Sequence, residues 1–304
     1  MTAAGGEPAG ERQDGLVPSL REVRGTQLAR FGRYTRRFAA LYERARRWDR
    51  PEFVTADWRA RNRALERRLF PTPPARFLHA DEIRYQMFVG DRCLAEQVAF
   101  LRILGHDASV LAEDAAGDPP MLVEVDGVVT SANTVHHVHH LRRFEIATSV
   151  ACAAVGTVLE WGGGYGSLAK LFRRIHGGAP TYAIIDTPLF SCVQWLYLSS
   201  VFGDDHTHVL LDRRDTLLPG RFNLVPLALA SSLEIEPQLF VSTWALNESA
   251  VDVQAMVVER RWFGAPHLLL GMHDGDPLIA KATRDGARAE PVGACMPAQR
   301  YLFR

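Results

Sequence analysis

Apolar residues recur every three or four positions between Leu20 and Phe70, which predicts two or three amphipathic helices. The same stretch holds fifteen arginines and six acidic residues. Arginine-rich helix faces are usually solvated, and no aromatic-interleaved pattern typical of nucleic-acid binding accompanies these arginines, so we expect no nucleic-acid partner. Residues 1–19 are rich in Gly, Pro, Ala and charged residues, and we expect a disordered tail there.

Two further helices are expected, one over 81–104 and one over 134–153 with Asn133 as its N-cap. Between them, weak alternation of apolar and polar residues around the pair Asp126-Gly127 predicts a hairpin. Residues 20–154 are therefore expected to form a mainly helical cap or lid region.

After Gly156 the pattern changes to short apolar strands that alternate with helices. This alternation predicts a mostly parallel sheet covered on both faces, with DGARAEPVGACMPAQRYLFR at the C-terminus as an antiparallel hairpin. We therefore predict an α/β fold with a Rossmann-like domain over 155–304. The expected strands are TVLEW, TYAIID, either HVLLD or FNLVP, LFVST and HLLLGM, with helices over 167–175, 189–202 and 249–263.

Composition narrows the class of protein. The chain has 304 residues, 47% of them hydrophobic, and its 35 basic residues equal its 35 acidic ones, so no net field attracts an acidic partner. Four widely spaced cysteines predict neither a disulfide framework nor a zinc site, and a reducing cytoplasm is the expected location. No signal-peptide core and no apolar run long enough to span a bilayer occurs, so we expect no membrane segment.

The segment VLEWGGGYGSLAKLF, residues 158–172, places four glycines between an apolar strand and an apolar helix. Glycines there let the backbone and the helix N-terminus approach a ligand closely. The dinucleotide-binding fingerprint fails at its third glycine position, where Ser167 stands. Glu160 precedes the glycines, and a carboxylate suits a cofactor with ammonium and sulfonium groups better than a pyrophosphate. At the end of the next strand, Asp186 is expected to bind ribose hydroxyls.

The pattern E-x-G-x-G-x-G at 160–166 resembles the first motif of the class I S-adenosylmethionine (SAM) methyltransferases. Three ordered segments, EWGGGYG, IDTP followed by QWLYL, and STWALNES, resemble the sugar O-methyltransferase family of bacterial biosynthetic clusters. The resemblance implies a class I methyltransferase sheet, SAM as co-substrate, and an O-methyltransferase of bacterial secondary metabolism that acts on a sugar or natural-product hydroxyl. The implied cofactor-binding residues are Glu160, Gly162, Gly163, Gly164, Tyr165, Gly166, Asp186, Thr187 and Ser242.

The acceptor side departs from that family. Where its members carry Asn, Ser and Met, this chain has Ser242, Ala245 and Ser249, and Trp244 is bulkier than expected. The expected residues of the substrate pocket are Asn133, Trp161, Gln194 and Trp244.

The cluster HHVHH at 136–140 is the source of the expected catalytic group. Its histidines lie one helical turn apart, so His136 or His137 is expected to act as general base, with Glu248 as the alternative. No third ligand stands at a diagnostic spacing, so no metal site is predicted.

Two other functions stay open at the level of sequence. One is intramolecular cyclisation of SAM to a small-ring amino acid and methylthioadenosine, and the other is a non-catalytic SAM-binding accessory protein. The expected partner is a small molecule, and a homodimer is left open.

Overall fold

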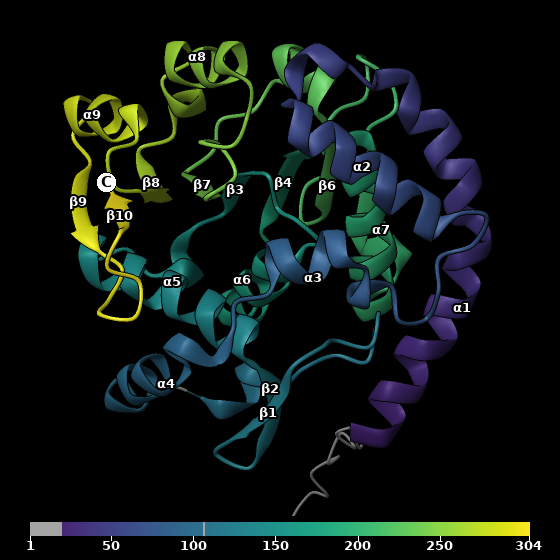
Figure 1. Ribbon diagram of the computed structural model, residues 1–304, viewed down its shortest axis with the longest axis horizontal. Helices are drawn as coiled ribbons and strands as arrows, with labels where there is room; N and C mark the ends of the chain where they lie inside the picture. Colours follow the sequence, from purple (N-terminus) through teal and green to yellow (C-terminus); the bar gives the residue numbers. More distant parts are fainter. Residues whose placement is uncertain (1–19, 106) are drawn as a thin grey trace, which may run out of the picture.

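The computed structural model describes residues 20–105 and 107–304 (Figure 1). The tail predicted for residues 1–19 lies outside the described residues. In the described chain, an eight-stranded sheet is covered on both faces by helices, and a two-stranded hairpin forms a second sheet. None of the described helices is long and apolar enough to cross a membrane.

The large sheet is mostly parallel. Its strands and those of the hairpin are, in chain order, β1 (Leu122–Val125), β2 (Val128–Ser131), β3 (Thr157–Trp161), β4 (Thr181–Asp186), β5 (Thr207–Val209), β6 (Phe222–Pro226), β7 (Leu239–Thr243), β8 (His267–His273), β9 (Arg288–Pro291) and β10 (Gln299–Phe303). The order across the large sheet is β5-β6-β4-β3-β7-β8-β10-β9, and β10 runs antiparallel to both of its neighbours. The predicted parallel sheet with a C-terminal antiparallel hairpin is confirmed.

Helices cover the sheet because its strands are apolar on both sides. Val158 of β3 belongs to one buried cluster and Leu159 to the other, as expected for a parallel sheet between two helical layers. One layer contains α5, α6 and α7, and the other contains α8 and α9. The helices are α1 (Leu20–Ala45), α2 (Ala56–Leu69), α3 (Asp81–Met87), α4 (Leu94–Ile103), α5 (Ala132–Thr148), α6 (Ser167–His176), α7 (Pro188–Phe202), α8 (Val251–Glu259) and α9 (Pro277–Arg284).

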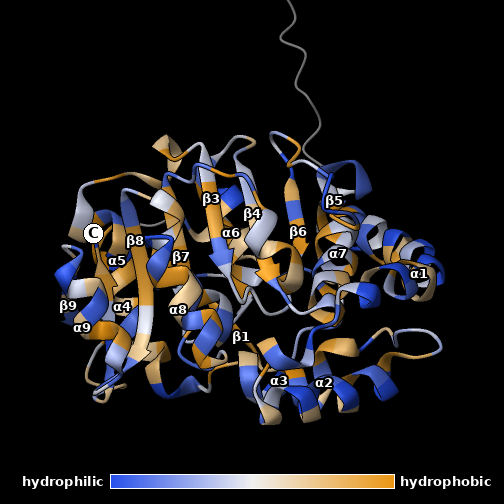
Figure 2. Cartoon of the chain, turned by 90° about the horizontal axis from the view of Figure 1, so that it is seen from above, coloured by the Kyte–Doolittle hydropathy of each residue, from blue (hydrophilic) through white to orange (hydrophobic). Residues whose placement is uncertain are grey.

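The N-terminal helices add to this core. α1 packs along α7 and buries a stripe with helical spacing that includes Phe31, Tyr34 and Phe38 (Figure 1). α7 therefore has neighbours on all sides, which accounts for its nearly uninterrupted apolar sequence. α2 and α3 lie beyond the carboxyl ends of β3, β4 and β6 (Figure 2), where they face the central strands.

Three predicted helices differ in their bounds. The helix expected over 81–104 is broken after α3, because Phe88 is extended and its ring stacks on Tyr165 with centroids 5.3 Å apart. The helix expected over 134–153 is α5. It ends at Thr148, before a left-handed Ser149, and its N-cap is Ser131, not Asn133. The helix expected over 249–263 is the shorter α8, because residues 261–263 take positive φ angles.

Both candidates for the third strand form strands. FNLVP is β6, which pairs with β4, while the start of HVLLD lies in β5 at the edge of the sheet. α9 was not expected from the sequence. Its signal was the pair Asp276-Pro277, since the Asp276 carboxylate caps the helix by accepting a hydrogen bond from the Leu278 N–H at 2.8 Å.

The expectation that the cysteines form no disulfide is wrong. Cys93, just before α4, is bonded to Cys295 in the β9–β10 connection, 202 positions further along the sequence. Spacing along the chain gave no sign of this pair because the two cysteines meet only in the tertiary structure. The inference of a reducing cytoplasm rested partly on unpaired cysteines and loses that support.

Reduction of the disulfide is expected to destabilise the protein. Because the bond closes a long loop, its loss should lower the free energy of unfolding by about 2–5 kcal/mol. Thermal unfolding with and without a reductant measures the effect. The double variant Cys93→Ser/Cys295→Ser is the control: it should unfold at the lower temperature in both conditions. An equal melting temperature for oxidised and reduced wild type would contradict the prediction.

Candidate functional site

A cavity of about 380 Å³ opens at the carboxyl ends of β3, β4 and β7. The neighbours of β3 in the sheet are β4 on one side and β7 on the other, and ligands of open α/β sheets bind at such a switch point. The N-terminal helices form the opposite wall. The lining includes Trp58, Met87, Phe88, Asn133, His136, His137, His140, Glu160, Trp161, Gly162, Gly163, Gly164, Tyr165, Asp186, Thr187, Trp244, Glu248 and Gln299.

The backbone between β3 and α6 forms one wall of the cavity. Gly162 has a φ of +71°, and a Cβ there would lie 2.1 Å from the Cβ of Ala245, so only glycine fits. Gly164 has a φ of +56°, and a Cβ there would lie 2.9 Å from Met87 Sδ. Gly166 is the N-cap of α6 and does not line the cavity. The backbone at 162–164 is therefore open to close approach by a ligand.

Glu160 lies near the end of β3 and is 3% exposed. Its Oε2 accepts a hydrogen bond from the Tyr182 hydroxyl at 3.0 Å. Burial raises the pKa of Glu160 to about 8, and the Tyr182 hydrogen bond offsets only part of this rise. At neutral pH the carboxyl group is therefore mainly protonated unless a cation lies beside it.

Asp186 ends β4 and is held by two donors. Its Oδ1 accepts from the Thr187 N–H at 2.8 Å, and its Oδ2 accepts from the Gln194 amide at 2.9 Å. Burial raises the pKa of Asp186 to about 7, and these hydrogen bonds limit the rise. The Gln194 amide also donates to the carbonyl of Gly164 at 3.0 Å. Gln194 is fully buried and does not line the cavity, so it ties the glycine loop to Asp186 and does not face an acceptor.

The loop after β7 is held from within. Ser242 is fully buried and does not line the cavity: its hydroxyl donates to the Trp161 carbonyl at 3.2 Å and accepts from the Leu246 N–H at 3.0 Å. The Trp161 indole donates to Ser249 Oγ at 3.1 Å. Thr187, which lines the cavity, caps α7 through its side chain. Ser242 and Trp161 thus position the loop after β7 beside the glycines.

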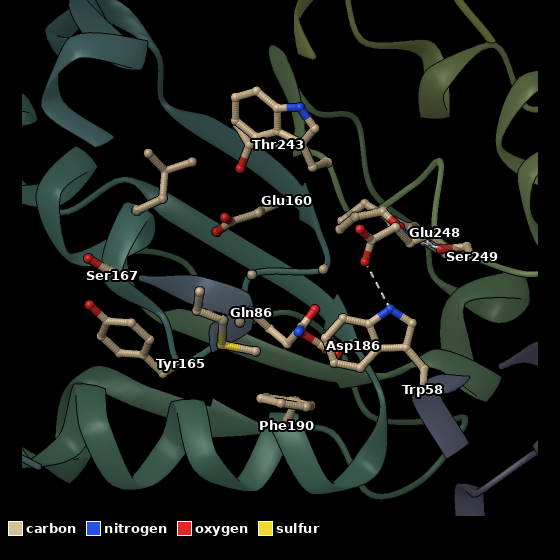
Figure 3. Close-up of a pocket in the computed structure, with 18 of the residues that line it drawn as sticks. Trp58, Gln86, Glu160, Tyr165, Ser167, Asp186, Phe190, Thr243, Glu248 and Ser249 are labelled. Carbon is tan, nitrogen blue, oxygen red and sulfur yellow. Dashed lines mark hydrogen bonds between the residues drawn. The ribbon is translucent and has the colours of Figure 1, made fainter. Parts of the chain in front are cut away.

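The cap region contributes residues that the sequence analysis did not identify. The indole of Trp58 on α2 donates to Glu248 Oε2 at 3.0 Å, and Figure 3 shows this bond across the cavity. Trp58 also packs edge-on against Phe190 of α7. Residues 190 positions apart in sequence meet here, so no local pattern pointed to the contact.

Helix α5 presents His136, His137 and His140 to the cavity. Nε2 of His136, Nδ1 of His137 and Nε2 of His140 are buried and have no hydrogen-bond partner within the described chain. Burial lowers the pKa of His137 to about 3 and holds those of His136 and His140 well below the usual value. All three are therefore neutral at pH 7. In the part of the chain that the structure describes, no group of three His, Cys, Asp or Glu residues is placed to hold a metal ion.

Two other predicted pocket residues lie beside these histidines. Asn133 is buried and donates from its amide to the Tyr165 hydroxyl at 3.0 Å. The Trp244 indole stacks on His136 with centroids 5.9 Å apart, and its N–H donates to Gln299. Trp244 has a φ of +62°, an uncommon conformation for a bulky residue, which turns its ring toward the cavity wall.

The charge on the cavity wall is one-sided. Glu160, Asp186 and Glu248 line it, and among the residues at 20–105 and 107–304 no arginine or lysine does. The nearby Lys170 of α6 is fully buried and is held 2.9 Å from Glu113 and 3.2 Å from Asp114. Burial alone would raise the pKa of Glu113, but the Lys170 ammonium and two hydroxyl donors lower it to about 2. The positive charge of Lys170 is therefore balanced inside the protein by these two carboxylates.

The chain has only distant likeness to the solved structures named here, with low identity and low TM-scores. No protein-family model and no curated protein matches the chain. Among solved structures, the chain is similar to PigF with SAH (12% identity, TM-score 0.37), covering 56% of this chain and 58% of PigF. It is similar to human N-acetylserotonin methyltransferase in complex with SAM (13% identity, TM-score 0.30, 69% of this chain and 64% of that one). It is also similar to the mitomycin 7-O-methyltransferase MmcR (14% identity, TM-score 0.36), covering 81% of this chain and 94% of MmcR.

At these TM-scores, neither an activity nor a ligand is assigned to this chain from its neighbours. The fold is assigned from the sheet itself. The mostly parallel sheet, the antiparallel hairpin at its C-terminal edge and the glycine loop after its central strand form the Rossmann-like α/β fold expected from the sequence.

The buried carboxyl group of Glu160 predicts a pH dependence of stability. Its pKa is about 8 in the folded protein and about 4.5 when unfolded, so only the unfolded chain loses this proton between those values. Stability should therefore fall as the pH rises through this window. The free energy of unfolding of Glu160→Gln, relative to wild type, should be higher at pH 8 than at pH 5 by roughly 2–4 kcal/mol.

Chemical denaturation at both pH values measures this difference. Glu234→Gln, which changes an exposed glutamate, is the matched control and should show no such difference. The prediction fails if the relative stability of Glu160→Gln is the same at pH 5 and pH 8.

Proposed function

We propose that the protein is a SAM-dependent O-methyltransferase that acts on a hydroxyl group of a small molecule, a sugar or natural product, in bacterial secondary metabolism. The charge of the cavity carries the proposal. Three carboxyl groups line it, and no arginine or lysine of the described chain does. SAM brings a sulfonium and an ammonium group, which favour the ionised forms of these carboxyl groups, whereas a dinucleotide brings a pyrophosphate that no cationic side chain there would neutralise.

The residues of the cavity fit SAM. The backbone at 162–164 would lie against the ligand, with Glu160 at the ammonium group and Asp186 at the ribose hydroxyls. Each Asp186 oxygen accepts one hydrogen bond from the protein, which leaves lone pairs for the hydroxyls. Trp161 and Tyr165 would flank the sulfonium, since an aromatic face attracts a cation. Bound SAM supplies an activated methyl group.

The chain itself would orient the reactants, exclude water and take up a proton. Within residues 20–154, the segments of α2 and α3 would act as the cap, because Trp58, Met87 and Phe88 close the side of the cavity opposite the sheet, whereas α5 covers the sheet itself. The neutral histidines of α5 have buried ring nitrogens without partners, which suits a base for the hydroxyl proton. Glu248 already accepts from Trp58, which favours a latch between cap and sheet over a role as base.

The nucleoside product tests the function. Incubation of the protein with SAM and a panel of sugars, phenols and natural-product alcohols should give S-adenosylhomocysteine and a methylated acceptor, identified by mass. SAM alone should give neither product. Methylthioadenosine from SAM alone would indicate cyclisation, and binding without any turnover would indicate an accessory protein; either result would overturn the proposal.

Asp186 is expected to contribute strongly to nucleoside affinity. Asp186→Ala removes the acceptor for the ribose hydroxyls and should weaken binding of S-adenosylhomocysteine roughly 10- to 100-fold, the value of hydrogen bonds to a charged group. Isothermal titration calorimetry measures the change. Asp252→Asn, at an exposed position on α8, is the control and should bind as wild type does. Unchanged affinity of Asp186→Ala would refute the assignment.

A further inference from the structure

The hydroxyl group of Tyr301 on β10 lies between two neighbouring histidines of α5. It is 2.5 Å from Nδ1 of His140 and 3.2 Å from Nδ1 of His139. Tyr301 and His140 are fully buried, and His139 is 4% exposed. Three groups that can each accept and donate a proton thus form a continuous chain.

The two histidines belong to different environments. Consecutive residues on a helix point about 100° apart, so His140 lines the cavity while His139 does not. His139 packs edge-on against Phe100, on the side where Arg143 forms an ion pair with Glu290. The side chains of that pair are 21% and 34% exposed, so the chain of groups runs from the cavity toward the surface.

The Tyr301 hydroxyl has one hydrogen, so it can donate to only one of the two Nδ1 atoms at a time. When it donates to His139, His140 must donate from its own Nδ1 and keeps a bare Nε2 in the cavity. When it donates to His140, the protonation of both rings is reversed. Two complementary arrangements of the same three groups therefore exist, and they differ by the transfer of protons along the chain.

Resting on the proposed function, we propose that His140 is the general base and that Tyr301 and His139 carry the proton out of the cavity. Transfer of a methyl group from a sulfonium to a hydroxyl releases one proton, which a cavity closed by the cap must export. His140 offers a hydrogen-bonded route on its far side. Nδ1 of His136 meets only the Gln97 amide, and Nδ1 of His137 has no partner in the described chain.

The step balances in protons and electrons. The acceptor oxygen forms its bond to the methyl carbon while the carbon–sulfur bond breaks and its electron pair stays on sulfur. The acceptor proton passes to His140 Nε2, the Nδ1 proton of His140 passes to the Tyr301 oxygen, and the original Tyr301 proton passes to His139 Nδ1. His139 then releases its Nε2 proton to solvent.

Low proton affinity at both ends of the relay is consistent with rapid release. Burial lowers the pKa of His139 to about 4, with the charge of Arg143 adding to the effect. Burial likewise holds the pKa of His140 well below its usual value. Neither ring therefore retains a second proton at neutral pH, and each stays a neutral imidazole with one N–H.

Nuclear magnetic resonance tests the relay without turnover. In the full-length protein with ¹⁵N-labelled histidine and bound S-adenosylhomocysteine, His139 and His140 should be neutral at pH 7 and carry their protons on different ring nitrogens. Tyr301→Phe keeps the ring packing and should abolish this complementarity. Tyr197→Phe is the matched control, since its buried hydroxyl has no hydrogen-bond partner in the described chain, and it should leave the pattern unchanged.

The same protonated nitrogen on both wild-type rings, or a pattern that Tyr301→Phe leaves intact, would overturn the relay.

With an acceptor that gives product, Tyr301→Phe and His139→Gln should each lower kcat roughly tenfold at unchanged KM for SAM, and the double variant should be no slower than either. Additive losses would also overturn it. If no SAM-derived product forms, that result contradicts the proposed function. The relay is still tested by which ring nitrogens of His139 and His140 carry protons.

Discussion

One buried ion pair sets the relative positions of the two helices that make the site. Lys170 belongs to α6, which starts at the glycine loop, and its partner Glu113 also accepts hydrogen bonds from Ser131 and Thr134 at the start of α5. The same carboxylate therefore holds both the helix that follows the glycine loop and the helix that carries the histidines. Breaking such a buried pair on one side costs about 3–5 kcal/mol, because it leaves an uncompensated buried charge.

The ion pair also explains the unusual charge of the cavity. Lys170 lies next to the site, but Glu113 and Asp114 neutralise it where water does not reach. Most arginines of α1 and α2 whose side chains the structure describes are exposed on the surface. A chain with as many basic as acidic residues thus builds a cavity lined, within the described chain, by three carboxyl groups and by no arginine or lysine. A cationic ligand in such a cavity favours the ionised forms of these groups, because an opposite charge nearby lowers the pKa of a carboxyl group.

The strand–glycine–helix unit and the parallel sheet could be read from the sequence because both depend on local spacing. Gly162 and Gly164 take positive φ angles, which are a local property of the loop, although the atoms that would clash with a Cβ come from Ala245 after β7 and Met87 of α3. Gln194 was expected to face the acceptor, yet its amide joins Gly164 to Asp186 beneath the loop. Its helix was correctly expected, but the direction of one side chain on a helix buried on all sides depends on its packing partners.

Local pattern along the chain thus establishes the sheet, all of its covering helices except α9, and the acids at the ends of β3 and β4, because strand and helix periodicity reflect nearby residues. The tertiary structure alone brings Cys93 to Cys295, Trp58 to Glu248, and Tyr301 to His139 and His140. These contacts join residues about 160 to 200 positions apart, and their geometry follows from how helices dock on the sheet. No spacing rule encodes such docking, because it is decided by the packing of whole side-chain surfaces.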